Sequence, residues 1–266
     1  MRAWWSGLFA VSACYRGAAD ESCRIRCTDN CPSGLSCVAG YCTSGAVCAG
    51  DVDASVDSVA VDAPVDAAVQ YFVQHADIGM AGAATVSFPY ALEQRAGDLN
   101  VVVIAYAVGI SIVSVTDTSG NAYAVAAPAL DSNAGAQAMY YARNIAAAGA
   151  GANTVTVTFS AATNVVLRGV EYTGISATSL VEAEAHGDGT AVDSGPLVVP
   201  FAPALLVGAD QLVYNSVAND PAYTLRSDYF GNTIEDRLVS MTGSYQATDV
   251  QNISAGWVMQ LIAFQP

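Results

Sequence analysis

Apolar and polar side chains alternate with a period of two through the long C-terminal part of the chain. In the clearest stretch, Val155, Val157 and Phe159 share one side of an extended strand, and the threonines between them share the other. Residues 101–107 and 257–264 are nearly continuous apolar runs, a pattern typical of strands buried on both faces. Shorter runs predict further strands at residues 71–76, 84–88, 110–116, 122–126, 136–143, 165–172, 180–186, 204–209, 222–226 and 234–240.

Turn-forming residues separate these runs. Clusters of Gly, Asn, Asp and Ser predict turns at residues 96–98, 118–121, 149–153 and 187–189. About a dozen short strands without a long amphipathic helix predict an all-β domain over residues 71–266, an antiparallel and jelly-roll-like β-sandwich. We expect Val155, Val157, Phe159 and Trp257 in the core between its two sheets.

Residues 137–149 fit this pattern least well, because they contain several alanines, the best helix formers. The adjacent Tyr140 and Tyr141 and the Gly-rich turn that follows favour a strand. A helix is the alternative.

The N-terminus has the pattern of an export signal. Met1-Arg2 precedes a short apolar run that ends at Val11, too short for a permanent membrane span. The tetrad Val11-Ser12-Ala13-Cys14 resembles the bacterial lipobox. This resemblance implies a signal peptide over residues 1–13, fatty acyl chains on Cys14 and a lipid anchor in the cell envelope. Tyr15 is not the Asp that often retains such lipoproteins at the inner membrane, which implies the outer membrane or cell surface. An ordinary secreted protein is the alternative.

Seven cysteines lie near the N-terminus, and none follows Cys48. After a short tether over residues 14–22, six of them fall within residues 23–48: Cys23, Cys27, Cys31, Cys37, Cys42 and Cys48. So short a segment has too little apolar surface for its own core, so we predict a disulfide-rich module with three cross-links of open connectivity. Zinc is the competing interpretation, although the spacings differ from paired Cys-x-x-Cys motifs. The segment from Cys31 to Cys42 resembles small Cys-rich modules of bacterial surface lipoproteins.

Charge and composition limit the partners. The chain has twenty-four acidic side chains against nine arginines and no lysine, a formal net charge of −15. Such a surface cannot neutralise phosphates, which excludes nucleic acid as a partner. Residues 49–70, rich in Asp, Val and Ala, predict an extended, self-repelling linker, because Asp and Val are poor helix formers and Asp is depleted in strands.

Four motifs in the β-rich part resemble a β-sandwich module that recurs in secreted and surface proteins of bacteria. They are Ala96-Gly97-Asp98-Leu99, the run from Val115 to Tyr123, the run from Tyr140 to Asn144, and the run from Asn153 to Val157. The resemblance implies fold and location, and it brings no catalytic residue and no cofactor.

Few residues offer metal or acid–base chemistry, and no common catalytic motif occurs. Glu182, Glu184 and His186 alternate along one predicted strand, and Asp188 follows it. We interpret them as a solvated strand face, because same-face neighbours lie ~6.6 Å apart and three from one straight strand rarely reach one ion. His75 and Asp77 are expected to form an exposed pair. Weak calcium candidates are Asp117, Ser119 and Asn121, for which a tight turn around Gly120 is the favoured interpretation.

Four tyrosines in the less regular part of the domain are the ligand-binding candidates: Tyr214, Tyr223, Tyr229 and Tyr245. Tyr has a flat apolar face and a polar tip, which suit sugar rings or protein hot spots. Packing at strand ends is the alternative. The favoured function is a non-catalytic, adhesive surface lipoprotein that binds a polysaccharide or a partner protein. A spacer without a ligand and a glycan hydrolase remain open, the latter with Glu171 and Glu182 as the pair to test.

Overall fold

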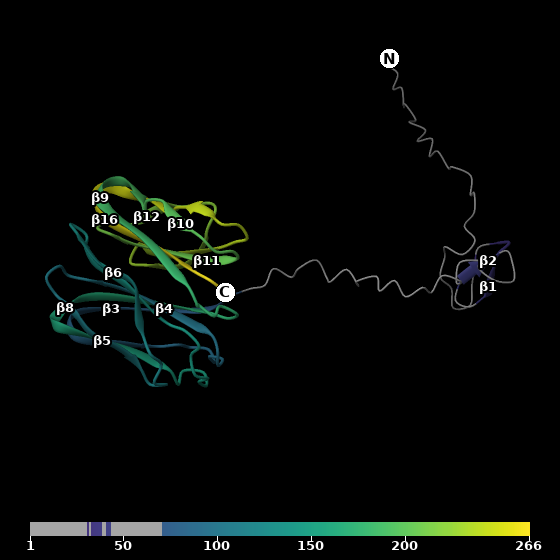
Figure 1. Ribbon diagram of the computed structural model, residues 1–266, viewed down its shortest axis with the longest axis horizontal. Helices are drawn as coiled ribbons and strands as arrows, with labels where there is room; N and C mark the ends of the chain where they lie inside the picture. Colours follow the sequence, from purple (N-terminus) through teal and green to yellow (C-terminus); the bar gives the residue numbers. More distant parts are fainter. Residues whose placement is uncertain (1–30, 32, 39–40, 44–70) are drawn as a thin grey trace, which may run out of the picture. The chain divides into compact units, whose positions relative to one another are not determined.

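The computed structural model describes residues 31, 33–38, 41–43 and 71–266 (Figure 1). The chain divides into two compact units, Met1–Ala67 and Ala68–Pro266. No helix among the described residues is long and apolar enough to cross a membrane.

The described part of the first unit is a small disulfide-linked hairpin. Strands β1 (Ser36–Val38) and β2 (Tyr41–Thr43) pair antiparallel, and a disulfide joins Cys31 to Cys42 with 5.6 Å between the Cα atoms. Cys37 is also disulfide-bonded. These cysteines therefore carry disulfides, as predicted.

Several predictions concern residues outside the described part of the chain. They are the signal peptide over residues 1–13, the lipidated Cys14, the tether over residues 14–22, the pairing of Cys23, Cys27 and Cys48, and the linker over residues 49–70.

The second unit consists of two packed antiparallel sheets, which confirms the predicted β-sandwich. Sheet I has the order β3-β8-β4-β7-β6, with β5 also paired to β8. Its strands are β3 (Phe72–Pro89), β4 (Leu99–Tyr106), β5 (Ile112–Asp117), β6 (Ala124–Ser132), β7 (Gly135–Ala142) and β8 (Thr154–Tyr172).

Sheet II has the order β9-β16-β11-β14-β13, with β12 also paired to β16. Its strands are β9 (Leu180–Asp193), β11 (Ala204–Leu212), β12 (Ser216–Asn219), β13 (Thr224–Tyr229), β14 (Asn232–Val239) and β16 (Thr248–Phe264). A separate pair, β10 (Leu197–Val199) and β15 (Gly243–Tyr245), completes this part of the domain.

The two sheets repeat one topology. Each is made from a continuous part of the chain, the first repeat (residues 72–172) and the second repeat (residues 180–264), which form the lower and upper layers in Figure 1. In both sheets, the long first strand pairs with the long last strand. The last strand also pairs with the central strand, and the central strand pairs with one strand of a hairpin. Strands β3, β4, β5, β6, β7 and β8 thus correspond to β9, β11, β12, β13, β14 and β16.

The register of the central strands makes the correspondence residue-specific. Leu99–Tyr106 pairs with β8, and Leu205–Leu212 pairs with β16, over eight residues in each case. In both segments the side chains of odd-numbered residues, such as Val101 and Val207, pack in the core between the sheets. Every residue of β4 therefore has a counterpart in β11.

The apolar core has three layers. The cluster between the sheets includes Val103 of sheet I and Ile262 of sheet II. A second cluster lies on the outer face of sheet I, where the bent ends of β3 and β8 bring Phe88 and Val157 against Val102. A third covers the outer face of sheet II, where the strands β10 and β15 contribute.

This layering corrects the predicted position of four core residues. Val155, Val157 and Phe159 are buried as expected, but on the outer face of sheet I, and Trp257 is buried on the outer face of sheet II. The prediction missed the outer clusters because an alternating apolar–polar pattern shows that one face of a strand is buried. It does not show whether that face packs between the sheets or on the outside of one sheet.

The strand predictions were right for the buried central strands, since β4 and the second half of β16 are buried throughout. Residues 137–142 are strand, as favoured over a helix. Segments predicted as separate strands are continuous in β3 and β8, and β10, β12 and β15 were not predicted. The turn predicted at residues 187–189 was wrong, because these residues lie inside β9, next to a register shift against β16.

Candidate functional site

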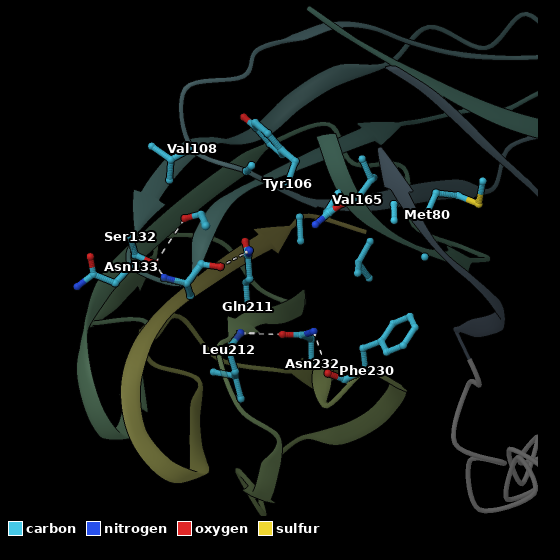
Figure 2. Close-up of a pocket in the computed structure, with 18 residues that line it drawn as sticks. Met80, Tyr106, Val108, Ser132, Asn133, Val165, Gln211, Leu212, Phe230 and Asn232 are labelled. Carbon is cyan, nitrogen blue, oxygen red and sulfur yellow. Dashed lines mark hydrogen bonds between the residues drawn. The ribbon is translucent and has the colours of Figure 1, made fainter. Parts of the chain in front are cut away.

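A cleft of about 760 Å³ opens between the two sheets at one end of the sandwich (Figure 2). Its larger apolar side chains are Met80, Tyr106, Val108, Val165, Leu212 and Phe230. Its polar side chains are Ser132, Asn133, Asn164, Gln211 and Asn232. A concave cavity of this size that combines apolar walls with convergent polar groups is the usual form of a small-ligand site.

The repeated topology builds this cleft from equivalent parts of both repeats. The β6–β7 turn and the β13–β14 turn both line it, and so do the ends of the central strands β4 and β11. Each hairpin turn also packs against the other sheet. Phe230 of the second repeat lies on Gly79 of β3, and Asn133 of the first repeat lies on Gly256 of β16.

Arg168 of β8 joins the two sheets through buried hydrogen bonds. Its guanidinium is fully buried and donates to the carbonyl of Thr233 at 2.7 Å, to the carbonyl of Asp210, and to Gln137 Oε1 at 3.0 Å. The β11–β14 ladder ends at the Ala209–Ile234 pair. Beyond it, Asp210 Oδ1 accepts the Thr233 N–H at 2.7 Å, so side chains replace the ladder where the strands separate.

Gln211 has a fixed orientation at the edge of the cleft. Its Nε2 donates to the carbonyl of Ala134 at 2.8 Å. Gly135, with φ at +122°, makes room for this amide, because a Cβ there would collide with Gln211 Nε2. Gln211 Oε1 is buried and has no hydrogen-bond donor among the described residues.

Phe230 occupies an unusual position in the β13–β14 turn. Its φ is +54° and that of Gly231 is +72°, the pattern of a two-residue hairpin turn that normally selects Asn-Gly. The ring is 68% exposed, yet one edge contacts the backbone of β3, where a Cβ on Gly79 would lie 2.5 Å from Phe230 Cε2. An aromatic ring is thus held at the rim of the cleft against the local backbone preference.

The lining of the cleft carries no Asp, Glu, His, Lys or Arg. Tyr106 is its one ionisable side chain, and burial, then the neighbouring Asp131 and Tyr140, raise the pKa of its hydroxyl above the ordinary value. The side chains of the cleft can therefore contact apolar surface and exchange hydrogen bonds with a ligand, and they offer no group of suitable pKa for acid–base catalysis at neutral pH.

A smaller hollow of about 350 Å³ adjoins the cleft and shares Val108 and Asn133 with it. Here His186 Nδ1 lies 2.6 Å from the carbonyl of Asp131, and Asn133 Nδ2 donates to Asp188 at 3.2 Å. Of the predicted strand face, Glu184 instead accepts a bond from Gln260. Burial, then neighbouring Glu184, raise the pKa of Glu182. No group of three His, Cys, Asp or Glu residues in the described part of the chain is arranged to hold a metal ion.

The weak calcium candidates form a turn. Asp117 Oδ1 accepts the N–H of Asn121 at 2.9 Å, Oδ2 accepts its side-chain N–H at 2.7 Å, and Gly120 takes a positive φ of +74°. Ser119 donates its N–H to Asn153 Oδ1 at 3.3 Å. These contacts match the tight turn favoured from the sequence. His75 and Asp77 also form the expected pair, with 2.9 Å between Nδ1 and Oδ2.

The four candidate tyrosines do not form one surface. Tyr223 is buried and Tyr245 is half-buried in the outer cluster of sheet II, with Arg237 over both rings. Tyr229 stacks edge-on against Phe230, and Tyr214 is 41% exposed just after β11. None of them lines the cleft, and Phe230 next to Tyr229 does.

Glu171 and Glu182 do not face each other. Glu171 is buried in sheet I, where it accepts a hydrogen bond from Gln74 at 2.5 Å, and Glu182 lies in β9 of sheet II. Burial, together with a hydrogen bond to the Asp98 carboxyl, raises the pKa of Glu171 to about 7. The tested pair for a hydrolase therefore lacks the required geometry.

Sequence analysis did not find the buried carboxyls of the second repeat. Both carboxyl oxygens of Glu235 are buried without a hydrogen-bond donor among the described residues, and burial, then Asp220, Asp210 and Asp249, raise its pKa to about 9. Burial also raises the pKa of Asp210 despite the opposing effect of Arg168. Asp210 lies inside an apolar strand, whereas Glu235 has mostly polar neighbours along its strand, so no shared pattern in the sequence marks them.

Searches against models of protein families, curated proteins and solved structures find no match to this chain.

Proposed function

We propose that this protein is an exported, lipid-anchored surface protein whose β-sandwich binds an uncharged polysaccharide without cleaving it. The observation that carries the proposal is the cleft between the sheets, which combines apolar walls, side-chain amides and the absence of charge in its lining. Such a lining complements hydroxyl groups and the apolar faces of sugar rings.

Charge argues against anionic ligands. Residues 71–266 carry sixteen acidic and five basic side chains, and no cation lines the cleft. An anionic glycan would approach a repulsive surface and find no partner for its carboxylates or sulfates. A neutral glycan meets neither penalty.

The anchor and linker belong to the same proposal on sequence grounds. The lipobox resemblance at Cys14 implies attachment to the envelope, and the linker over residues 49–70 provides reach from it. A binding domain presented in this way would attach the cell to a glycan surface.

The test is binding of the full-length protein to immobilised neutral glucans, xylans and mannans compared with anionic alginate and heparin. We expect saturable binding to at least one neutral glycan that changes little with salt concentration, because no ion pair forms. Binding confined to anionic glycans, or release of new reducing ends from a bound glycan, would contradict the proposal.

A further inference from the structure

The position equivalent to Gln211 shows that the fold does not need an amide there. Leu99–Tyr106 and Leu205–Leu212 occupy the same place in the two repeats, so Gln211 corresponds to Ala105. Both residues are at the ends of central strands that line the cleft. A small apolar residue suffices in one repeat, so Gln211 requires an explanation beyond folding.

The orientation of Gln211 gives that explanation. Turning the amide over would place Oε1 against the carbonyl of Ala134, two acceptors facing each other, so the bond from Nε2 keeps Oε1 in its present direction. Oε1 is buried without a donor in the described part of the chain, which is costly for an amide oxygen. Because Oε1 has almost no exposed surface, a donor from outside the chain reaches it only when the side chains around it shift.

Phe230 provides the second element. Each hairpin has a two-residue turn, and Phe230, like Asn133 in the first repeat, is its first residue. The two turns differ in conformation, because φ is positive at Phe230 and not at Asn133. Asn is also the residue that the left-handed φ of Phe230 normally selects. The second repeat thus carries an aromatic ring at the rim of the cleft, at a backbone position that normally selects Asn.

We infer that Gln211 and Phe230 determine the specificity of the cleft, with a sugar ring stacked on Phe230 and one ring hydroxyl donating to Gln211 Oε1. The inference rests on the proposed function, since it names the chemistry read at the same cleft. The selected ligand is an uncharged pyranoside with a free hydroxyl at the position that faces Gln211.

The twin repeat supplies the test variants. Gln211→Ala copies the residue of the first repeat, and Phe230→Asn introduces a residue that tolerates the left-handed φ of this turn, so we expect both variants to fold. Met241→Ala is the control, because Met241 is 71% exposed, like Phe230, and does not line the cleft. The probes are neutral gluco-, xylo- and manno-hexasaccharides, followed by mono-deoxy forms of the one that binds best, measured by titration calorimetry on the full-length protein.

We expect Q211A to lower affinity about tenfold and to bind one deoxy form as well as the parent sugar, because the lost hydroxyl no longer has an acceptor. We expect F230N to lower affinity by about tenfold or more for parent and deoxy forms alike, and M241A to change neither. Melting curves of all three should match or exceed the wild type.

The outcomes separate the inference from the function. If the wild type binds a hexasaccharide and Q211A binds it equally well with unchanged preference among deoxy forms, the inference is wrong and the function stands. If F230N alone has no effect, the stacking half of the inference is wrong. If no hexasaccharide binds the wild type, the proposed function and the inference fail together.

Discussion

The two repeats of the sandwich share a topology and differ in the hydrogen bonding of one buried glutamate each. In the first repeat, Glu171 accepts a hydrogen bond from Gln74. In the second repeat, Glu235 has no donor among the described residues and lies near other carboxyls. The repeats also contribute different residues to the cleft: Ala105 and Asn133 come from the first repeat, and Gln211 and Phe230 come from the second.

The comparison shows which residues the fold requires in both repeats and which positions can vary between them. Both repeats keep apolar residues on the inner face of the central strand and a long bent pair at the edge. Positions at strand ends and turns vary without changing the strand order. Positions at which the repeats differ are therefore the ones available for function.

The largest effect is expected from truncating the outer clusters of both repeats. Phe159→Ala and Trp257→Ala should each lower the free energy of unfolding by about 3–5 kcal/mol. Because the two side chains lie in separate clusters, their effects should add within about 0.5 kcal/mol in a double-mutant cycle followed by urea unfolding. A strong coupling would show that the clusters are one core and would contradict the layered account.

The next largest effect on the free energy of unfolding is expected at Arg168, whose buried side chain joins the two repeats. Arg168 and Gln260 occupy equivalent positions, so Arg168→Gln gives the first repeat the residue of the second. The change removes the donors to the carbonyls of Thr233 and Asp210, and we expect a loss of about 3–5 kcal/mol in chemical unfolding. A loss below about 1 kcal/mol would mean that the separated strands need no buried cation.

The buried carboxyls should give the two repeats different pH dependences. Their folded pKa values lie above the ordinary 4.5, at about 7 for Glu171 and about 9 for Glu235, so folding favours the protonated forms. The stability they contribute is fully present below about pH 4.5 and is lost as pH rises through those folded values.

Glu235→Gln therefore should melt several degrees above the wild type at about pH 9 and close to it at about pH 4.5. Glu171→Gln is the matched variant from the first repeat and should remove the decline between about pH 4.5 and pH 7 instead. Differential scanning fluorimetry across this range measures both. Parallel profiles for wild type and E235Q would show that folding does not raise the pKa of Glu235.

The smallest effect concerns the hairpin turns. Phe230→Asn places the preferred residue at a positive φ, and we expect a gain of about 1 kcal/mol, or about 2–4 °C in melting temperature. Asn133→Phe in the twin turn is the reciprocal change and should destabilise, because Asn133 packs on Gly256 and bonds Asp188. A drop in melting temperature for F230N would mean that the ring stabilises the fold and is not retained for binding.

The sequence predicted the fold from features that act locally. The period of two around Val157 and the apolar run of residues 257–264 specify strands whatever surrounds them. The bends of β3 and β8, and hence the outer clusters, depend on register shifts that no local pattern marks.

The site was harder to predict because its residues are ordinary by type. Tyrosines drew attention as binding residues, whereas the cleft contains Phe230 and Gln211, whose roles depend on a left-handed turn and on the carbonyl of Ala134. The Phe-Gly-Asn sequence at residues 230–232 was the one available signal, since a bulky residue before Gly in a tight hairpin is unusual. The correspondence of Gln211 with Ala105 needs the strand register.

The central claim is that an uncharged glycan occupies the cleft between the sheets, and methyl NMR of methionine-labelled protein tests it most directly. Met80 lines the cleft and is 47% exposed, whereas Met241 is more exposed and lies outside it, and Met139 and Met259 are buried. Addition of a neutral hexasaccharide should shift the Met80 methyl signal in a saturable manner and leave that of Met241 unchanged. Saturable binding of the sugar with an unchanged Met80 signal would contradict the claim.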